Sequence, residues 1–97
     1  MTMNRDKVLA ELNRDLEAVR GFERNVNQLL TAMRNPNMGA DLDSEVRGLR
    51  YNQHCILLYL GRASAVLELL DVTRDGELTT GDELAGFIEA FKSEYPA

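Results

Sequence analysis

Two long stretches in which apolar residues recur every three to four positions limit what this chain of 97 residues can fold into. A repeat with that period places the apolar side chains on one face of an α-helix. The first stretch runs from Leu9 to Met33 and the second from Leu42 to Leu70. Residues 35–37, Asn-Pro-Asn, separate them, and proline cannot continue the helical hydrogen-bond ladder. The sequence therefore predicts an all-α fold that begins with a long antiparallel helical hairpin.

We expect one helical domain over residues 1–97, because a chain of this length can form one modest core but not two. The predicted elements are a helix over 4–34, a helix over 42–70, an acidic loop over 71–82 and a shorter helix over 80–94. Glycine lowers helix stability by about 1 kcal/mol. A closed bundle in which the first helix folds back at Gly21 is therefore an equal alternative to the long hairpin.

The second helix has apolar residues on several sides, so it needs several neighbours to cover it. Its main stripe alternates steps of four and three, as in a coiled coil, and contains one polar residue, Gln53. A third helix of 15 residues would span only about 22 Å and leave part of the hairpin uncovered. We therefore predict an interface with a partner helix or a second copy of the chain, formed by Leu49, Ile56, Leu57, Tyr59, Leu60 and Leu67.

Composition places the chain among ordinary folded proteins, with 44% hydrophobic and 28% charged residues. Residues 71–97 contain seven acidic and two basic side chains, and no basic patch elsewhere supports direct nucleic-acid binding. Cys55 is the only cysteine, which excludes an internal disulfide and a cysteine-based zinc site. No apolar run is long enough for a membrane helix, and the N-terminus lacks the apolar core of a signal peptide. These features predict an intracellular protein, cytoplasmic or nuclear, that does not insert into membranes.

The acidic loop over 71–82 has oxygen-bearing side chains at the spacing that a hard cation needs. Loop positions 1, 3, 5, 7, 9 and 12 carry the ligands of an EF-hand, with glycine at position 6. Here Gly76 occupies the sixth position, and the six ligand positions hold Asp71, Thr73, Asp75, Glu77, Thr79 and Asp82. Residues 62–92 therefore resemble a single, degenerate EF-hand, and the resemblance implies a Ca²⁺ or Mg²⁺ site.

The loop departs from the EF-hand pattern in ways that predict weak binding. Asp82 is one methylene shorter than the glutamate usual at position 12, and Thr73 is neutral where a carboxylate or amide is usual. Glu83 would replace Asp82 as the last ligand if the loop were one residue longer. A metal-free connection is the alternative, because Thr80 and Glu83 have the spacing of a capping box at the start of the third helix.

A second resemblance lies in the middle of the second helix. Residues 50–62 resemble the helical domain of a GINS replication-complex subunit, on Asn52, Cys55, Leu57 and Tyr59. This resemblance implies a constitutive structural subunit of a larger assembly, with no metal.

No arrangement of residues in the sequence predicts catalysis. His54 and Cys55 are adjacent, and adjacent residues on a helix point about 100° apart, so they do not form a nucleophile and base pair. The sequence contains neither a glycine-rich phosphate loop nor a serine hydrolase motif. We therefore expect a non-enzymatic helical module for protein–protein interaction, and a constitutive structural subunit is the alternative.

Overall fold

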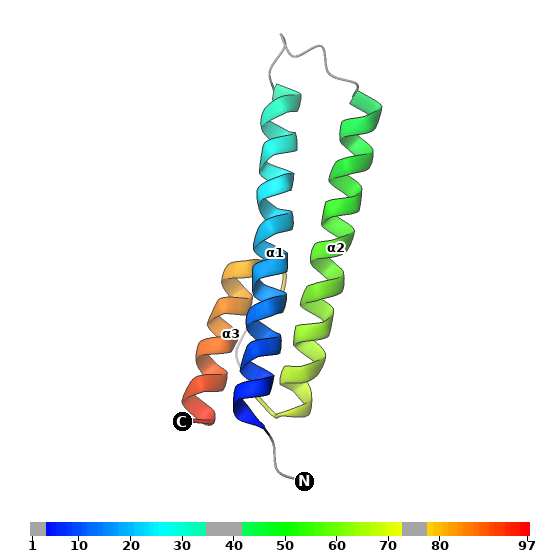
Figure 1. The fold of residues 1–97 in the computed structure, drawn as a ribbon. Helices are drawn as coiled ribbons and strands as arrows, with labels where there is room; N and C mark the ends of the chain where they lie inside the picture. Colours follow the sequence, from blue (N-terminus) through cyan, green and yellow to red (C-terminus); the bar gives the residue numbers. More distant parts are fainter. Residues whose placement is uncertain (1–3, 35–41, 73–77) are drawn as a thin grey trace.

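The structure is a computed structural model, and it describes residues 4–34, 42–72 and 78–97. These residues form three α-helices: α1 (Arg5–Arg34), α2 (Leu42–Leu69) and α3 (Gly81–Glu94). α1 and α2 lie side by side in opposite directions, and α3 runs in the same direction as α2 along one half of the pair (Figure 1). The all-α fold is confirmed, and the predicted helix ranges differ from the observed bounds by one residue at most.

α1 passes through Gly21 without a break, so the predicted alternative of a fold-back at this residue is wrong. The position is half-buried, and a Cβ added there would meet only the Arg24 side chain, at 3.8 Å. The helix therefore accommodates the glycine, whose cost of about 1 kcal/mol is small beside the burial of neighbouring Val19 against the core.

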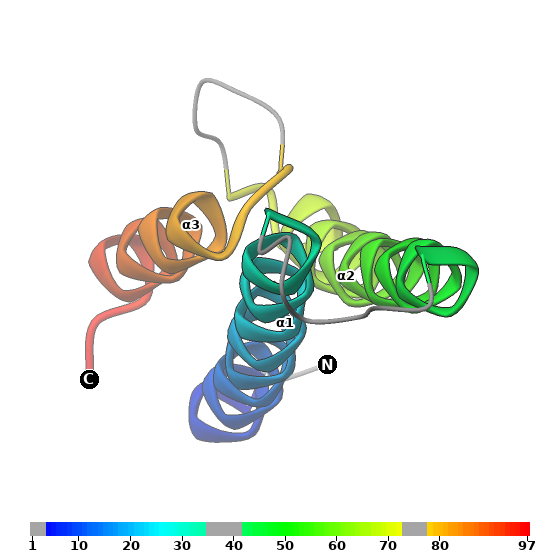
Figure 2. The same ribbon diagram turned by 90° about the horizontal axis from the view of Figure 1, so that it is seen from above.

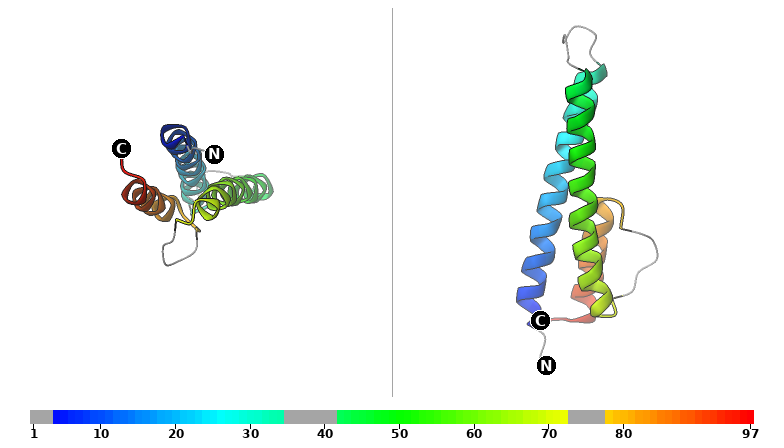
Figure 3. Two further views of the ribbon diagram at one scale, coloured as in Figure 1. Left: turned by 90° about the horizontal axis from the view of Figure 1, so that it is seen from below. Right: turned by 90° about the vertical axis from the view of Figure 1, so that its right-hand side faces the viewer.

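The hydrophobic core lies in the half of the hairpin that α3 covers. All three helices contribute side chains to it. Seen along the bundle, α2 and α3 both lie beside α1 (Figures 2 and 3). The structure is elongated, with principal extents of 56 × 20 × 19 Å, so the core occupies one end of a rod. The buried apolar residues of this core are Leu12, Val19, Leu60, Ala63, Leu67, Val72, Leu84, Ile88 and Phe91.

Both ends of α3 are attached to the hairpin. At its start, the Gly81 N–H donates to the Glu23 carboxylate at 3.1 Å, and the Thr80 hydroxyl accepts from the Glu83 N–H at 3.2 Å, as the predicted cap requires. At its other end, the Tyr95 hydroxyl donates to the Leu70 carbonyl at 2.8 Å. The first contact joins α3 to α1 and the last joins it to the end of α2. These contacts fix how far along the hairpin α3 lies.

A polar contact joins α1 and α2 in the half that α3 does not cover. Asn52 is buried; its amide donates to the Gly48 carbonyl at 2.7 Å and accepts from the Asn25 amide at 3.1 Å. Gln53, which the predicted stripe placed in the helix contact, is instead exposed. The predicted stripe follows a period of 3.5 residues, whereas an α-helix has 3.6 residues per turn, so the stripe drifts around the helix. At this point Asn52, and not Gln53, therefore faces α1.

Candidate functional site

The hairpin is about twice as long as the helix that covers it. α1 has 30 residues and α2 has 28, whereas α3 has 14. At 1.5 Å per residue these lengths are about 45, 42 and 21 Å. The half of the hairpin nearest residues 34 and 42 has no third helix beside it in the described part of the chain (Figure 1, and the right-hand view of Figure 3).

A groove opens between α1 and α2 where α3 begins. Its volume is about 650 Å³. Val26, Ile56 and Leu57 give it an apolar lining, and Thr79 and Asp82 close it at the start of α3. The groove therefore lies where a longer α3 would have continued along the hairpin. The remaining lining residues are Glu23, Asn27 and Gln53, all polar.

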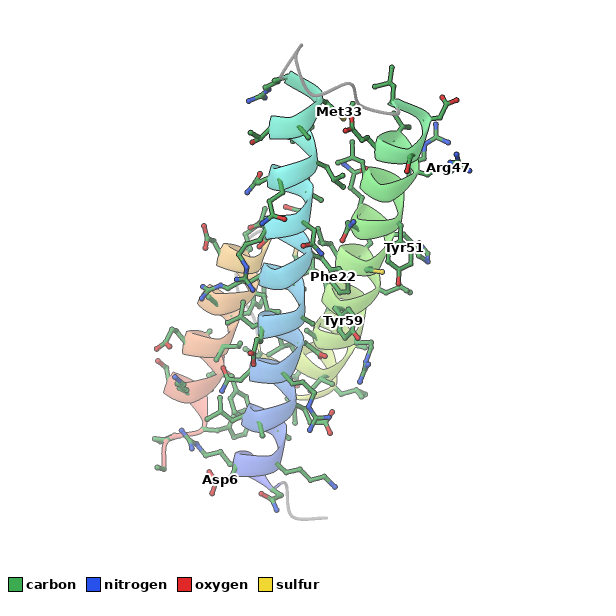
Figure 4. The ribbon with its side chains drawn as sticks, turned by 45° about the horizontal axis from the view of Figure 1, so that its top comes forward. Asp6, Phe22, Met33, Arg47, Tyr51 and Tyr59 are labelled. Carbon is green, nitrogen blue, oxygen red and sulfur yellow. The ribbon has the colours of Figure 1, made fainter. Side chains whose placement is uncertain are left out.

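Several large apolar side chains of α2 are exposed to solvent. The exposed fractions are 59% for Leu42, 65% for Tyr51, 63% for Leu57, 54% for Leu58 and 87% for Leu69. Arg47 and Tyr51 project from the side of α2 that faces away from α1 (Figure 4). Scattered exposed apolar residues are normal on a protein surface, but five on one helix that carries several arginines form a candidate interaction surface.

The six residues predicted to form a partner interface differ in their exposure to solvent. Leu60 and Leu67 are each 2% exposed inside the core, so in this conformation neither is available to a partner. Leu49, Ile56 and Tyr59 are half-buried, and the Tyr59 ring lies 5.8 Å from the Phe22 ring, centroid to centroid (Figure 4). Leu57 alone is exposed. Sequence periodicity identified apolar faces but could not show which of them α1 and α3 would cover.

Four of the seven predicted cation ligands lie in the described residues: Asp71, Thr79, Asp82 and Glu83. The Thr79 hydroxyl donates to the Glu83 carboxylate, and so does the Thr80 hydroxyl, at 3.2 Å. The Asp82 carboxylate is exposed and lies 3.9 Å from the Arg20 guanidinium. The other three, Thr73, Asp75 and Glu77, lie outside the described residues.

Asp71 and Asp82 lie at opposite ends of α3. Asp71 follows Leu70, whose carbonyl accepts from Tyr95 at the C-terminal end of α3, and Tyr95 in turn accepts from Arg5. Asp82, in the first turn of α3, lies beside Arg20, which is about 22 Å from Arg5 along α1 at 1.5 Å per residue. Oxygens that bind one Ca²⁺ lie within about 2.6 Å of it. In this conformation the two carboxylates therefore cannot bind the same ion.

No group of three or more His, Cys, Asp or Glu side chains in the described residues is arranged to hold a metal. The predicted Ca²⁺ or Mg²⁺ site over 71–82 stays a prediction, because Thr73, Asp75 and Glu77 lie outside the described residues. Thermal melts of the chain in EDTA, in Mg²⁺ and in Ca²⁺ test it. A midpoint several degrees higher with Ca²⁺ would support the site, since a ligand that binds the folded state stabilises it, and equal midpoints would contradict it.

The backbone at Asp71 gives this residue a structural role at the end of α2. Its φ is 55°, in the left-handed region that few residues other than glycine adopt. The Val72 N–H donates to the Leu67 carbonyl at 3.0 Å, and the Asp71 N–H donates to the Glu68 carbonyl at 3.1 Å. These two bonds form a Schellman motif, and Val72 and Leu67 are both buried, as the apolar contact of that motif requires.

Asp71→Gly is expected to raise the free energy of unfolding by about 0.5–1 kcal/mol, because glycine adopts a positive φ without the steric cost of a side chain. Asp71→Ala is the matched comparison, since it also removes the carboxylate but keeps a Cβ. We expect the alanine variant to be less stable than the natural chain. Urea denaturation in EDTA followed by circular dichroism measures both. Equal destabilisation by the two substitutions would show that the carboxylate, and not the backbone, matters here.

Comparisons of the chain with protein-family models, with curated proteins and with solved structures found no match. No helix in the described residues has the length and apolar character to cross a membrane. Of the residues that resemble a GINS subunit, Asn52 and Cys55 are buried, Tyr59 packs against Phe22 and Leu57 is exposed. The groove residues Glu23 and Val26 were not predicted as part of a site, and Thr79 was predicted only as a cation ligand, because these residues come together only through the placement of α3.

Proposed function

We propose that the chain is a non-enzymatic module for protein–protein interaction that binds an amphipathic helix of another protein in the groove beyond α3. The observation that supports this proposal is the difference in length between the hairpin and α3, which leaves an apolar groove on a preformed pair of helices. Binding of an amphipathic helix by its apolar face is a common mode of peptide recognition.

The groove has the chemistry that such a partner needs. Val26, Ile56 and Leu57 would contact apolar residues of the bound helix, and full burial of one aliphatic side chain contributes about 1.5–3 kcal/mol. Glu23 and Asp82 lie at the end of the groove next to α3. A partner helix that runs in the direction of α3 would place its C-terminal turn there, and basic residues are common and favourable in that turn.

The described residues around the groove support a binding role better than a catalytic one. Its polar side chains are acidic groups, amides and a hydroxyl, without a histidine or cysteine among them. His54 is exposed, and Cys55 is buried on the next position of the helix, so the two side chains point in different directions.

A helical-peptide display library, screened against the purified chain, tests the proposed function. Selected peptides should shift the amide resonances of Val26, Ile56 and Leu57 in two-dimensional NMR titrations. Leu57→Asp should weaken peptide binding at least tenfold, because it places a charge in the apolar groove. Leu69→Asp is the matched control, since Leu69 is also an exposed leucine of α2 but lies at its far end.

Peptides that bind elsewhere, or that bind the Leu57→Asp and Leu69→Asp variants equally well, would contradict the proposal. The constitutive structural subunit is the second possibility, and the same samples distinguish it. A subunit that needs permanent cover for this groove would aggregate when purified alone, whereas an interaction module would remain dispersed and folded.

A further inference from the structure

One face of α2 lies outside both the core and the groove. The helical period places a set of residues opposite the buried side of α2, which contains Asn52 and Ala63. Three of them, Tyr51, Leu58 and Leu69, are large and apolar. Every residue of this set is exposed, and we call the set the outer face of α2: Asp43, Arg47, Arg50, Tyr51, His54, Leu58, Gly61, Ala65, Glu68 and Leu69.

The charges on the outer face are divided along its length. Toward the start of α2, Arg47 and Arg50 follow Asp43, the single acidic residue of the face there, whereas the end of α2 has Glu68, followed by the exposed Asp71. Neither Arg50 nor Glu68 has an ion-pair partner within the described part of the chain. A second copy packed in parallel would place arginine against arginine. A second copy packed antiparallel would place arginine against carboxylate, which favours association.

We infer that the outer face of α2 packs antiparallel against the outer face of a second copy, with Arg50 of each chain paired with Glu68 of the other. A two-fold axis makes such a contact self-complementary, so that each pairing occurs twice. The inference concerns a different surface from the groove and does not depend on the proposed function.

The register that pairs Arg50 with Glu68 of the second copy also fits the other residues of the outer face. It places the two-fold axis beside residue 59, so Leu58 of both copies lie close to the axis. Gly61 lies two residues from the axis, and a Cβ added there would meet nothing within 4 Å, so the outer face is open to close approach at this point. Arg50 and Glu68 each lie nine residues from the axis, on opposite sides of it.

This contact is a single helix pair, which buries less surface than the roughly 800 Å² per partner typical of stable dimers. We therefore expect a weak dimer whose population depends on protein concentration. Analytical ultracentrifugation over a wide range of concentrations should show a monomer–dimer equilibrium. Because exposed ion pairs are screened by salt, high ionic strength should shift this equilibrium toward the monomer.

A charge-exchange experiment tests the proposed register. Arg50→Glu and Glu68→Arg should each weaken dimerisation at least tenfold, because each places like charges against one another. The double variant should restore dimerisation to within about threefold of the natural chain, since it exchanges the two charges. Arg24→Glu is the matched control, because Arg24 is an exposed arginine of α1 that is not on the outer face. Circular dichroism verifies that each variant is folded.

Three outcomes would overturn the inference. The first is a natural chain that stays monomeric at every concentration. The second is a double variant that dimerises as weakly as the single variants, which would show that Arg50 and Glu68 do not face each other. The third is an Arg24→Glu variant that loses dimerisation to the same extent. This result would show that the contact lies elsewhere or that dimerisation depends only on the net charge of the chain.

Discussion

Phe91→Ala is expected to lower the free energy of unfolding by about 3–5 kcal/mol, the largest effect of any substitution considered for this chain. The Phe91 side chain is completely buried where α3 meets the hairpin, and its ring lies 5.3 Å from that of Tyr95. Its removal would leave a cavity in the core. It would also remove the ring that packs on Tyr95, whose hydroxyl joins α3 to the end of α2.

Urea denaturation of the natural chain and the Phe91→Ala variant, followed by circular dichroism, measures this loss. Glu89→Ala is the matched control, because Glu89 is on the exposed side of the same helix and its pairing with Lys92 contributes little. A loss below about 1 kcal/mol for Phe91→Ala would show that α3 contributes little to the stability of the fold, contrary to the expected cost of an aromatic cavity.

Asp15→Asn is expected to increase the free energy of unfolding at neutral pH by about 1–2 kcal/mol, because it removes a charge from an apolar environment. Asp15 is 4% exposed and lies on α1 between Leu12 and Val19, both of which are completely buried. Burial raises the pKa of Asp15 above its ordinary value of 3.8, and the nearby Arg62 guanidinium only partly opposes this effect.

The direction of this pKa shift determines how stability depends on pH. The folded state holds the Asp15 proton more tightly than the unfolded state does, so ionisation of the carboxyl is less favourable in the folded chain. The contribution of Asp15 to stability is therefore most favourable below its unfolded pKa and decreases as the pH rises from there through the raised folded pKa. At pH values above the raised folded pKa, the buried charge lowers the stability of the natural chain by its full cost. The Asp15→Asn variant should not show this loss of stability with rising pH.

Thermal melts of the natural chain and the Asp15→Asn variant between acidic and neutral pH measure the difference. Asp6→Asn is the matched control, because Asp6 is an exposed carboxylate of the same helix. A variant that is less stable than the natural chain at neutral pH would show that the carboxylate contributes more through its attraction to Arg62 than its burial costs.

Local signals in the sequence were sufficient to predict the helices. The helical period of the apolar residues, with the interruption at residues 35–37, identified α1 and α2. The capping pair Thr80 and Glu83 identified the start of α3. Burial of Asp15 could have been predicted too, because residues 12, 15 and 19 have the steps of three and four that the helix contact follows. Charged residues are rarely buried, so the residue type and the helical period point to opposite conclusions at Asp15.

The position of α3 along the hairpin could not be predicted from the sequence. It depends on contacts between residues far apart in the chain, such as Glu23 with Gly81 and Tyr95 with Leu70. The spacing of oxygen side chains over 71–82 suggested that the ends of the loop meet, as in an EF-hand. The tertiary contacts instead separate Asp71 from Asp82 by most of the length of α3, and no local pattern contains that information.

The concentration of the core at one end has a consequence for local unfolding. Buried apolar residues support the half of the hairpin beside α3, whereas the other half relies on half-buried apolar side chains and the Asn25–Asn52 contact. Segments with fewer buried contacts open with a smaller free-energy cost than the whole protein. Backbone amides of α1 and α2 should therefore exchange with solvent progressively faster with distance from α3, which makes the uncovered end of the hairpin the part of the fold that a bound helix would protect most.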